Sequence, residues 1–186
     1  SLIGFSGQPG REAAHLAFAE ALAPAYGQDP WFLAQLAFAQ MEAGQLAPAD
    51  KAIEAALAQN PRSAHGAHIR AHLFYECGQT QAGCDYLSDW IAGYDRSGMM
   101  HCHNSWHVAL WSLALGDMDR MWGIADDDLS PEHSESPPLN ILKRAMMDEI
   151  DRLRQQLFNE LTASGGLVLP VRPPVGDRLD QRKLGR

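Results

Sequence analysis

Glycine and proline divide roughly the first 130 residues into segments of helical length. They recur roughly every 12–18 positions, the segments between them are rich in alanine, and the alternation of polar and apolar residues that marks a strand is absent. Short turns between such segments make neighbouring helices antiparallel. We therefore expect an all-α chain, with helices at residues 11–26, 31–43, 47–59, 64–77, 79–94, 101–115 and 118–126.

A repeating order of small and large residues runs through these helices. After Pro30 comes one helix with Leu33 and Ala37, a turn at Gly44, and a second helix that ends before Pro61. This order resembles a tetratricopeptide repeat, a helical hairpin that stacks on its neighbours to form a solenoid. Two later units place Gly78 and Gly116 at the same turn, 38 residues apart rather than about 34. The longer spacing predicts an inserted loop at residues 94–100.

Five runs of sequence give a more specific resemblance. They are GFSGQPGRE (4–12), NPRSAHGAHIRAHLFYECG (60–78), WIAGYDR (90–96), HCHNSWHVALWSLALGD (101–117) and SPPLNIL (136–142). Over residues 2–142 the chain resembles bacterial members of the tetratricopeptide repeat protein 38 family. The resemblance implies a helical-hairpin solenoid of about three repeats plus a partial one, and it brings no assigned reaction. Because residues 11–26 fit the second helix of a repeat, we expect the array to be truncated at its N-terminus.

Charge and proline content change near Pro137 and Pro138. Residues 1–138 carry 6 basic and 17 acidic residues, whereas residues 139–186 carry 9 basic and 6 acidic ones. We therefore expect a repeat array at 1–138 and, at 139–186, an amphipathic helix followed by an extended Pro-rich basic tail. The tail faintly resembles the C-terminus of bacterial sulfatases. The helix would pack on the array or pair with a second copy, giving a homodimer, through Met146, Ile150, Leu153, Leu157 and Leu161.

The composition excludes several classes of partner. An acidic main body disfavours nucleic acid, which needs clustered lysine and arginine. We expect no membrane span, because no long apolar run occurs. Three cysteines without a CxxC pair argue against a disulfide framework and for a reducing compartment, so we expect a cytoplasmic protein. Asp126, Asp127 and Asp128 lack the ligand spacing of a calcium loop and are expected to be a solvated helix end.

Histidines are concentrated on two of the expected helices. Six of the eight fall between His65 and His107, and the pairs His68/His72 and His103/His107 are each four residues apart. Residues four apart share one face of a helix. The family resemblance implies that the first helix of each repeat lines a concave groove. The expected groove residues are Trp31, Phe38, His65, His68, His72, His103, Trp106 and His107.

Three interpretations of the histidines stay open at this point. They could line a groove that holds a protein, peptide or small ligand, packing beside tryptophan. They could hold zinc or another transition metal through His68, His72, His103 and His107, as cofactor of a metal-binding protein or enzyme. A metal-free general acid or base is the third. No HExxH pattern and no convincing nucleophile is present, so we assign no catalytic residue and favour a binding scaffold over an enzyme.

Overall fold

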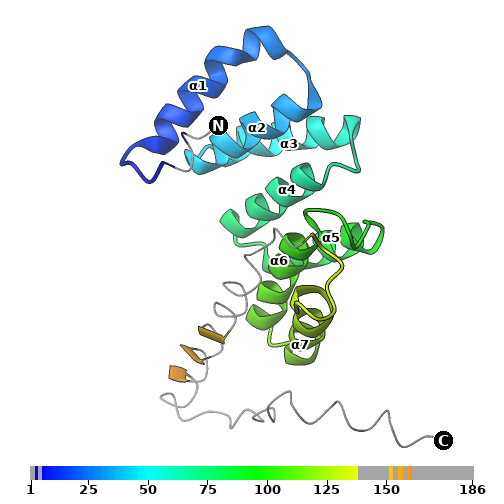
Figure 1. The fold of residues 1–186 in the computed structure, drawn as a ribbon. Helices are drawn as coiled ribbons and strands as arrows, with labels where there is room; N and C mark the ends of the chain where they lie inside the picture. The colour runs from blue at the N-terminus through cyan, green and yellow to red at the C-terminus, as the bar shows by residue number, and fades with distance from the viewer. Residues whose placement is uncertain (1–2, 4–5, 138–150, 153–154, 157–158, 161–186) are drawn as a thin grey trace, which may run out of the picture. The chain divides into compact units, whose positions relative to one another are not determined.

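The computed structural model describes residues 3, 6–137, 151–152, 155–156 and 159–160. These residues form helices and no β-strand, so the all-α prediction is confirmed for the described part of the chain (Figure 1). Each helix expected between residues 11 and 126 is present, and its ends differ by at most two residues from the prediction. The helices are α1 (Arg11–Tyr26), α2 (Pro30–Glu42), α3 (Leu46–Gln59), α4 (Ala64–Glu76), α5 (Thr80–Ala92), α6 (His101–Ala114) and α7 (Met118–Ile124), followed by a π-helical turn, η2 (Ala125–Leu129).

Short side chains and glycines set the ends of the helices. Asp29 accepts a hydrogen bond from the Phe32 backbone N–H at 2.8 Å, and Ser63 Oγ accepts one from the Gly66 N–H at 3.0 Å. Each bond satisfies an N–H that the first turn of a helix leaves free. Gly44 and Gly78 follow α2 and α4 with φ of 76° and 66°, a left-handed conformation that glycine adopts without steric cost.

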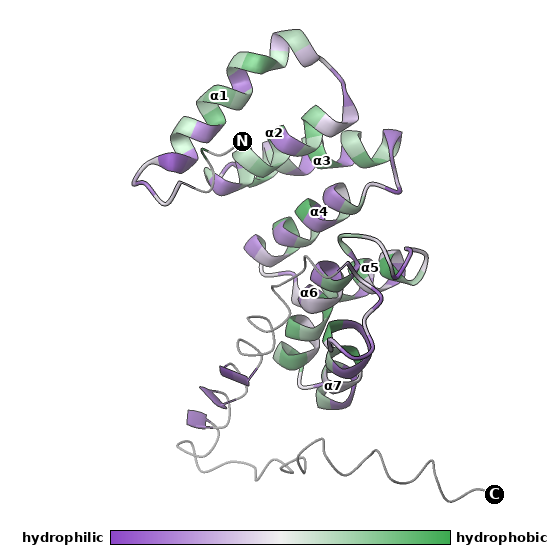
Figure 2. Ribbon diagram, viewed as in Figure 1, coloured by the Kyte–Doolittle hydropathy of each residue, from purple (hydrophilic) through white to green (hydrophobic). Residues whose placement is uncertain are grey.

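Two hydrophobic clusters lie on opposite sides of α4. The first joins α2, α3 and α4, and the second joins α4, α5 and α6. Ile69 and Leu73 point into the first cluster, whereas Ala67 and Ala71 belong to the second. Because α4 serves both clusters, successive helices share a continuous core. Figure 2 shows that α6 changes from hydrophilic residues at its start to hydrophobic residues toward its end.

Gly83 allows α5 to approach α6 closely. A Cβ atom at this position would lie 2.8 Å from the Trp111 ring and 2.9 Å from the Cβ of Phe74. Such separations are too short for carbon atoms in contact. Glycine is therefore required here because the indole of Trp111, which is buried, occupies the space of a methyl group.

The residues between α5 and α6 form the inserted loop that the spacing predicted. Residues 93–100 are turns and bends, and Tyr94 packs its ring on Trp90. Arg96 from this loop pairs with Asp128 at 2.7 Å and donates to the Asp127 carbonyl at 3.0 Å. The expectation of a solvated end is therefore wrong for Asp128, whose side chain is only 15% exposed because it partners Arg96.

The chain separates into two compact units, Ser1–Asp148 and Glu149–Arg186. In the second unit the described residues are helical and exposed, and Gln155 donates to Asn159 one turn later at 3.0 Å. The apolar stripe expected at residues 146–161 and the extended tail lie outside the described residues. Within the described ranges, no helix combines the length and apolar character needed to cross a bilayer.

Candidate metal centre

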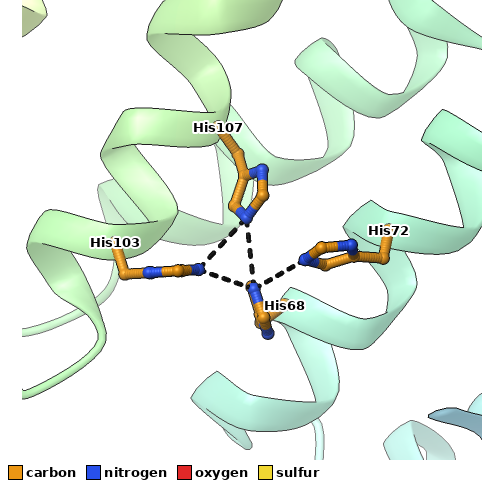
Figure 3. Close-up of side chains that lie close together, drawn as sticks. All are labelled: His68, His72, His103 and His107. Carbon is orange, nitrogen blue, oxygen red and sulfur yellow. Dashed lines mark hydrogen bonds between the residues drawn. The ribbon is translucent and has the colours of Figure 1, made fainter. Parts of the chain in front are cut away.

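Four histidine side chains from α4 and α6 point to one place. His68 and His72 lie one turn apart on α4, and His103 and His107 lie one turn apart on α6. The helix start at Ser63 and the cores on both sides of α4 fix the direction in which the first pair points. Figure 3 shows the four rings directed toward a common centre between the two helices. The structure thus brings together the two pairs that the sequence pattern singled out.

The Nε2 atoms of these rings approach one another closely. His68 Nε2 lies 2.9 Å from His72 Nε2, 2.8 Å from His103 Nε2 and 3.1 Å from His107 Nε2. His103 and His107 are joined by a fourth short separation of 3.2 Å. All four atoms lie within 4.8 Å of one another, and all four side chains are partly buried. We call His68, His72, His103 and His107 the histidine quartet.

Hydrogen bonds alone do not account for this arrangement. One nitrogen of a neutral imidazole carries a hydrogen and the other offers a lone pair, so each nitrogen can make one good hydrogen bond in the ring plane. His68 Nε2 faces three other nitrogens within 3.1 Å. Because His68, His103 and His107 also lie within 3.2 Å of one another, at least one pair among them sets a lone pair against a lone pair, or a hydrogen against a hydrogen. A cation at the centre removes the conflict, because all four lone pairs can then bind it.

The surroundings keep the rings neutral and so ready to donate to a metal. Burial lowers the pKa of His103 to about 4 and, with the nearby His72 and His103, that of His107 to about 2. Burial also lowers the pKa of His68, reinforced by the surrounding rings, and the pKa of His72, which Glu76 partly restores. At pH 7 the quartet therefore presents unprotonated nitrogens, the form that metal ions require.

The quartet has the chemistry of a site for a transition metal. A tetrahedral zinc ion with bonds of about 2.0–2.1 Å holds its nitrogen ligands about 3.3–3.4 Å apart, close to the 2.8–3.2 Å separations found here. Within the described part of the chain, no acidic side chain joins the four histidines in this group. Among the described residues, the second nitrogen of His68, Nδ1, is buried and has no hydrogen-bond partner, so packing orients this ring.

The other expected groove residues fall into two sets. Trp106 packs against His103 and His107, with ring centroids 5.6 and 5.0 Å apart, and His65 stands beside His68 with centroids 6.4 Å apart. Trp31 and Phe38 do not join this group among the described contacts. Trp31 is 64% exposed. Phe38 is partly buried and packs against the first hydrophobic cluster and against His15 of α1.

One residue beside the quartet was not anticipated. The side-chain nitrogen of Gln35, on α2, lies 2.5 Å from His65 Nε2. The contact shows that α2 borders the site next to α4. Gln35 lies on α2, the helix that the repeat register aligns with the two histidine-bearing helices. This alignment is the sequence signal that points to Gln35.

We expect the metal-free protein to lose stability as the pH falls from 7 to 5. The unfolded rings bind protons near pH 6.5, whereas the folded rings, with lowered pKa values, do not. The unfolded state then binds more protons than the folded state. The contribution of these rings to the free energy of unfolding is therefore fully present above about pH 6.5 and declines below it. Urea unfolding at pH 7, 6 and 5 measures this slope, and the double variant His103→Ala/His107→Ala should flatten it. An unchanged midpoint for the natural chain across this range would contradict the neutral quartet.

The sequence was also compared with known protein families, and no family model matches it.

Proposed function

We propose that this protein binds one divalent transition-metal ion, of the zinc class, through the Nε2 atoms of the histidine quartet. The observation that carries the proposal is the convergence of four neutral imidazole nitrogens, with separations of 2.8–3.1 Å from His68 to each of the others. Imidazole suits zinc, copper, nickel and iron, while magnesium and calcium prefer oxygen ligands. The metal interpretation thereby becomes the preferred one of the three.

The proposal places this ion in a tetratricopeptide-like array. The support is the sharing of α4 between two cores, together with the left-handed glycines that end α2 and α4 at equivalent turns. The resemblance to the bacterial tetratricopeptide repeat protein 38 family agrees with such an array. In this arrangement α2, α4 and α6 are the first helices of successive repeats, and the ion joins two of them.

Metal analysis of the full chain, purified without a histidine tag, tests the proposal. We expect about one equivalent of a transition metal after exposure to zinc and removal of loosely bound ions. The double variant His68→Ala/His107→Ala removes one ligand from each helix and should hold almost none. His133→Ala provides the matched control, because His133 is exposed and outside the quartet. Less than about a tenth of an equivalent in the natural chain would overturn the proposal.

A binding groove for a peptide is the second candidate function. It is favoured by the exposure of a large aromatic side chain, Trp31, at the start of α2. Such a residue on a repeat array is suited to contact a partner protein. Both functions can belong to one scaffold. The quartet would bind the metal ion, and the helices that carry it would form the surface that contacts the partner. A homodimer through residues 146–161 stays a prediction.

A further inference from the structure

The donor set of the quartet leaves the charge of a bound ion uncompensated. All four ligands are neutral imidazoles, so a divalent ion keeps both of its positive charges. Among the described residues, the groups that act on the four rings are the rings themselves, His65, which acts on His68, and Glu76, which acts on His72. Glu76 is exposed to solvent. A site of this kind attracts an anion to the ion itself.

The spacing of the nitrogens also fits an ion with more than four ligands. His68, His103 and His107 form a triangle with sides of 2.8, 3.1 and 3.2 Å, and His72 lies 2.9 Å from His68. Neighbouring positions on a six-coordinate ion are about 2.8–3.0 Å apart, against about 3.3–3.4 Å on a tetrahedral ion. Two of the four separations lie in the shorter range, and the other two lie between the ranges. An ion held by these four nitrogens can therefore keep further positions for other ligands.

The neighbours of the quartet suit a carboxylate more than a phosphate. Phosphate sites recruit arginine or lysine, and no such charge acts on the four rings in the described part of the chain. A neutral amide stands next to the neighbouring ring instead, at Gln35, whose side-chain nitrogen contacts His65 Nε2. The four side chains are only partly buried, as access by a small acid or a chain end requires.

We propose that the ion in the quartet, on whose binding this inference rests, accepts a carboxylate oxygen from the ligand that the protein binds. The carboxylate replaces a water molecule, so one metal–water bond breaks and one metal–oxygen bond forms. The ion keeps its oxidation state and no proton is transferred. The carboxylate belongs either to a small organic acid or to the C-terminus of a peptide, and both present the same group to the ion.

Cobalt(II) replacement tests this inference, because the visible spectrum of cobalt reports the number and type of its ligands. We expect the cobalt protein to show the weak absorption of an ion with more than four ligands, and acetate to change it saturably. Trialanine with a free C-terminus is compared with its amide. A response to the free peptide at lower concentration than acetate identifies a peptide end, and equal responses identify a small acid.

The outcomes separate this inference from the proposed function. Intense tetrahedral absorption that acetate and trialanine leave unchanged would show a closed four-nitrogen site, so that metal binding stands and the carboxylate is excluded. Absence of any bound cobalt would overturn both. His68→Ala should lack the protein-bound spectrum, and His133→Ala should keep both the spectrum and its acetate response, which excludes binding of cobalt at a surface histidine.

Discussion

Zinc raises the melting temperature of the metal-free protein by about 10–20 °C when free zinc reaches about a thousand times its Kd. Binding to the folded state alone contributes about 4 kcal/mol under this condition, since the unfolded chain does not hold the four nitrogens together. The size of the shift follows from the ratio of free zinc to Kd, and the proposed ion would act by joining α4 to α6. Thermal unfolding followed by circular dichroism, with and without zinc, measures it.

Two alanine variants on α4 make this measurement specific. His68→Ala should abolish the zinc shift, because its Nε2 atom is the one that approaches all three other ligands. His65→Ala should retain it, because His65 directs its Nε2 at Gln35 rather than into the quartet. The melting temperatures of the metal-free variants are measured first, so that any loss of stability from removing the imidazole ring is known. An equal zinc shift in His68→Ala and the natural chain would exclude the quartet as the site.

Gly83→Val destabilises the fold by roughly 2–4 kcal/mol. The new side chain meets the Trp111 ring at 2.8 Å and Phe74 at 2.9 Å, so α5 and α6 must separate or the indole must leave its buried position. Trp111 lies beside the histidine quartet, with its ring centroid 6.3 Å from that of His107. We therefore expect the same variant to weaken zinc binding, although it removes no ligand. Urea unfolding and zinc titration report the two effects.

A second glycine provides the control for this substitution. Gly123 lies in α7, and a Cβ atom added there meets nothing within 4 Å. Gly123→Val should change the free energy of unfolding by no more than about 0.5 kcal/mol, as expected for an open surface position. Equal losses in the two variants would indicate a general intolerance of valine in place of helical glycine and not a clash with Trp111.

The helices were predictable because their boundaries depend on local chemistry. The ends of α2 and α4 follow from glycine at Gly44 and Gly78, and the start of α4 follows from Ser63. The one-residue shift at the start of α2 has a simple cause: Pro30 fits the first helical position, where its missing N–H leaves no bond unmade. Such features act over a few residues and are visible in the sequence.

The candidate site was predictable in part. The four-residue spacing placed His68 with His72 and His103 with His107 on helix faces, and the repeat register suggested that the two helices are neighbours. The convergence of all four Nε2 atoms depends on rotamers and on the packing angle between α4 and α6, which no local pattern encodes. The same is true of Gln35, which reaches His65 from another helix, and of Phe38, which packs against His15 of α1.

The sharing of α4 has a consequence for how the molecule comes apart. Ile69 and Leu73 belong to one core, while Ala67 and Ala71 belong to the other. If α4 moves away, both cores lose buried residues. A local opening that exposes α4 must disrupt both sides at once, and its free energy approaches that of global unfolding. Amide protons of α4 would then exchange more slowly than those of α1, which packs against α2 through Leu16 and Ala19. His68 and His72 are thereby carried by a backbone that is held from two sides.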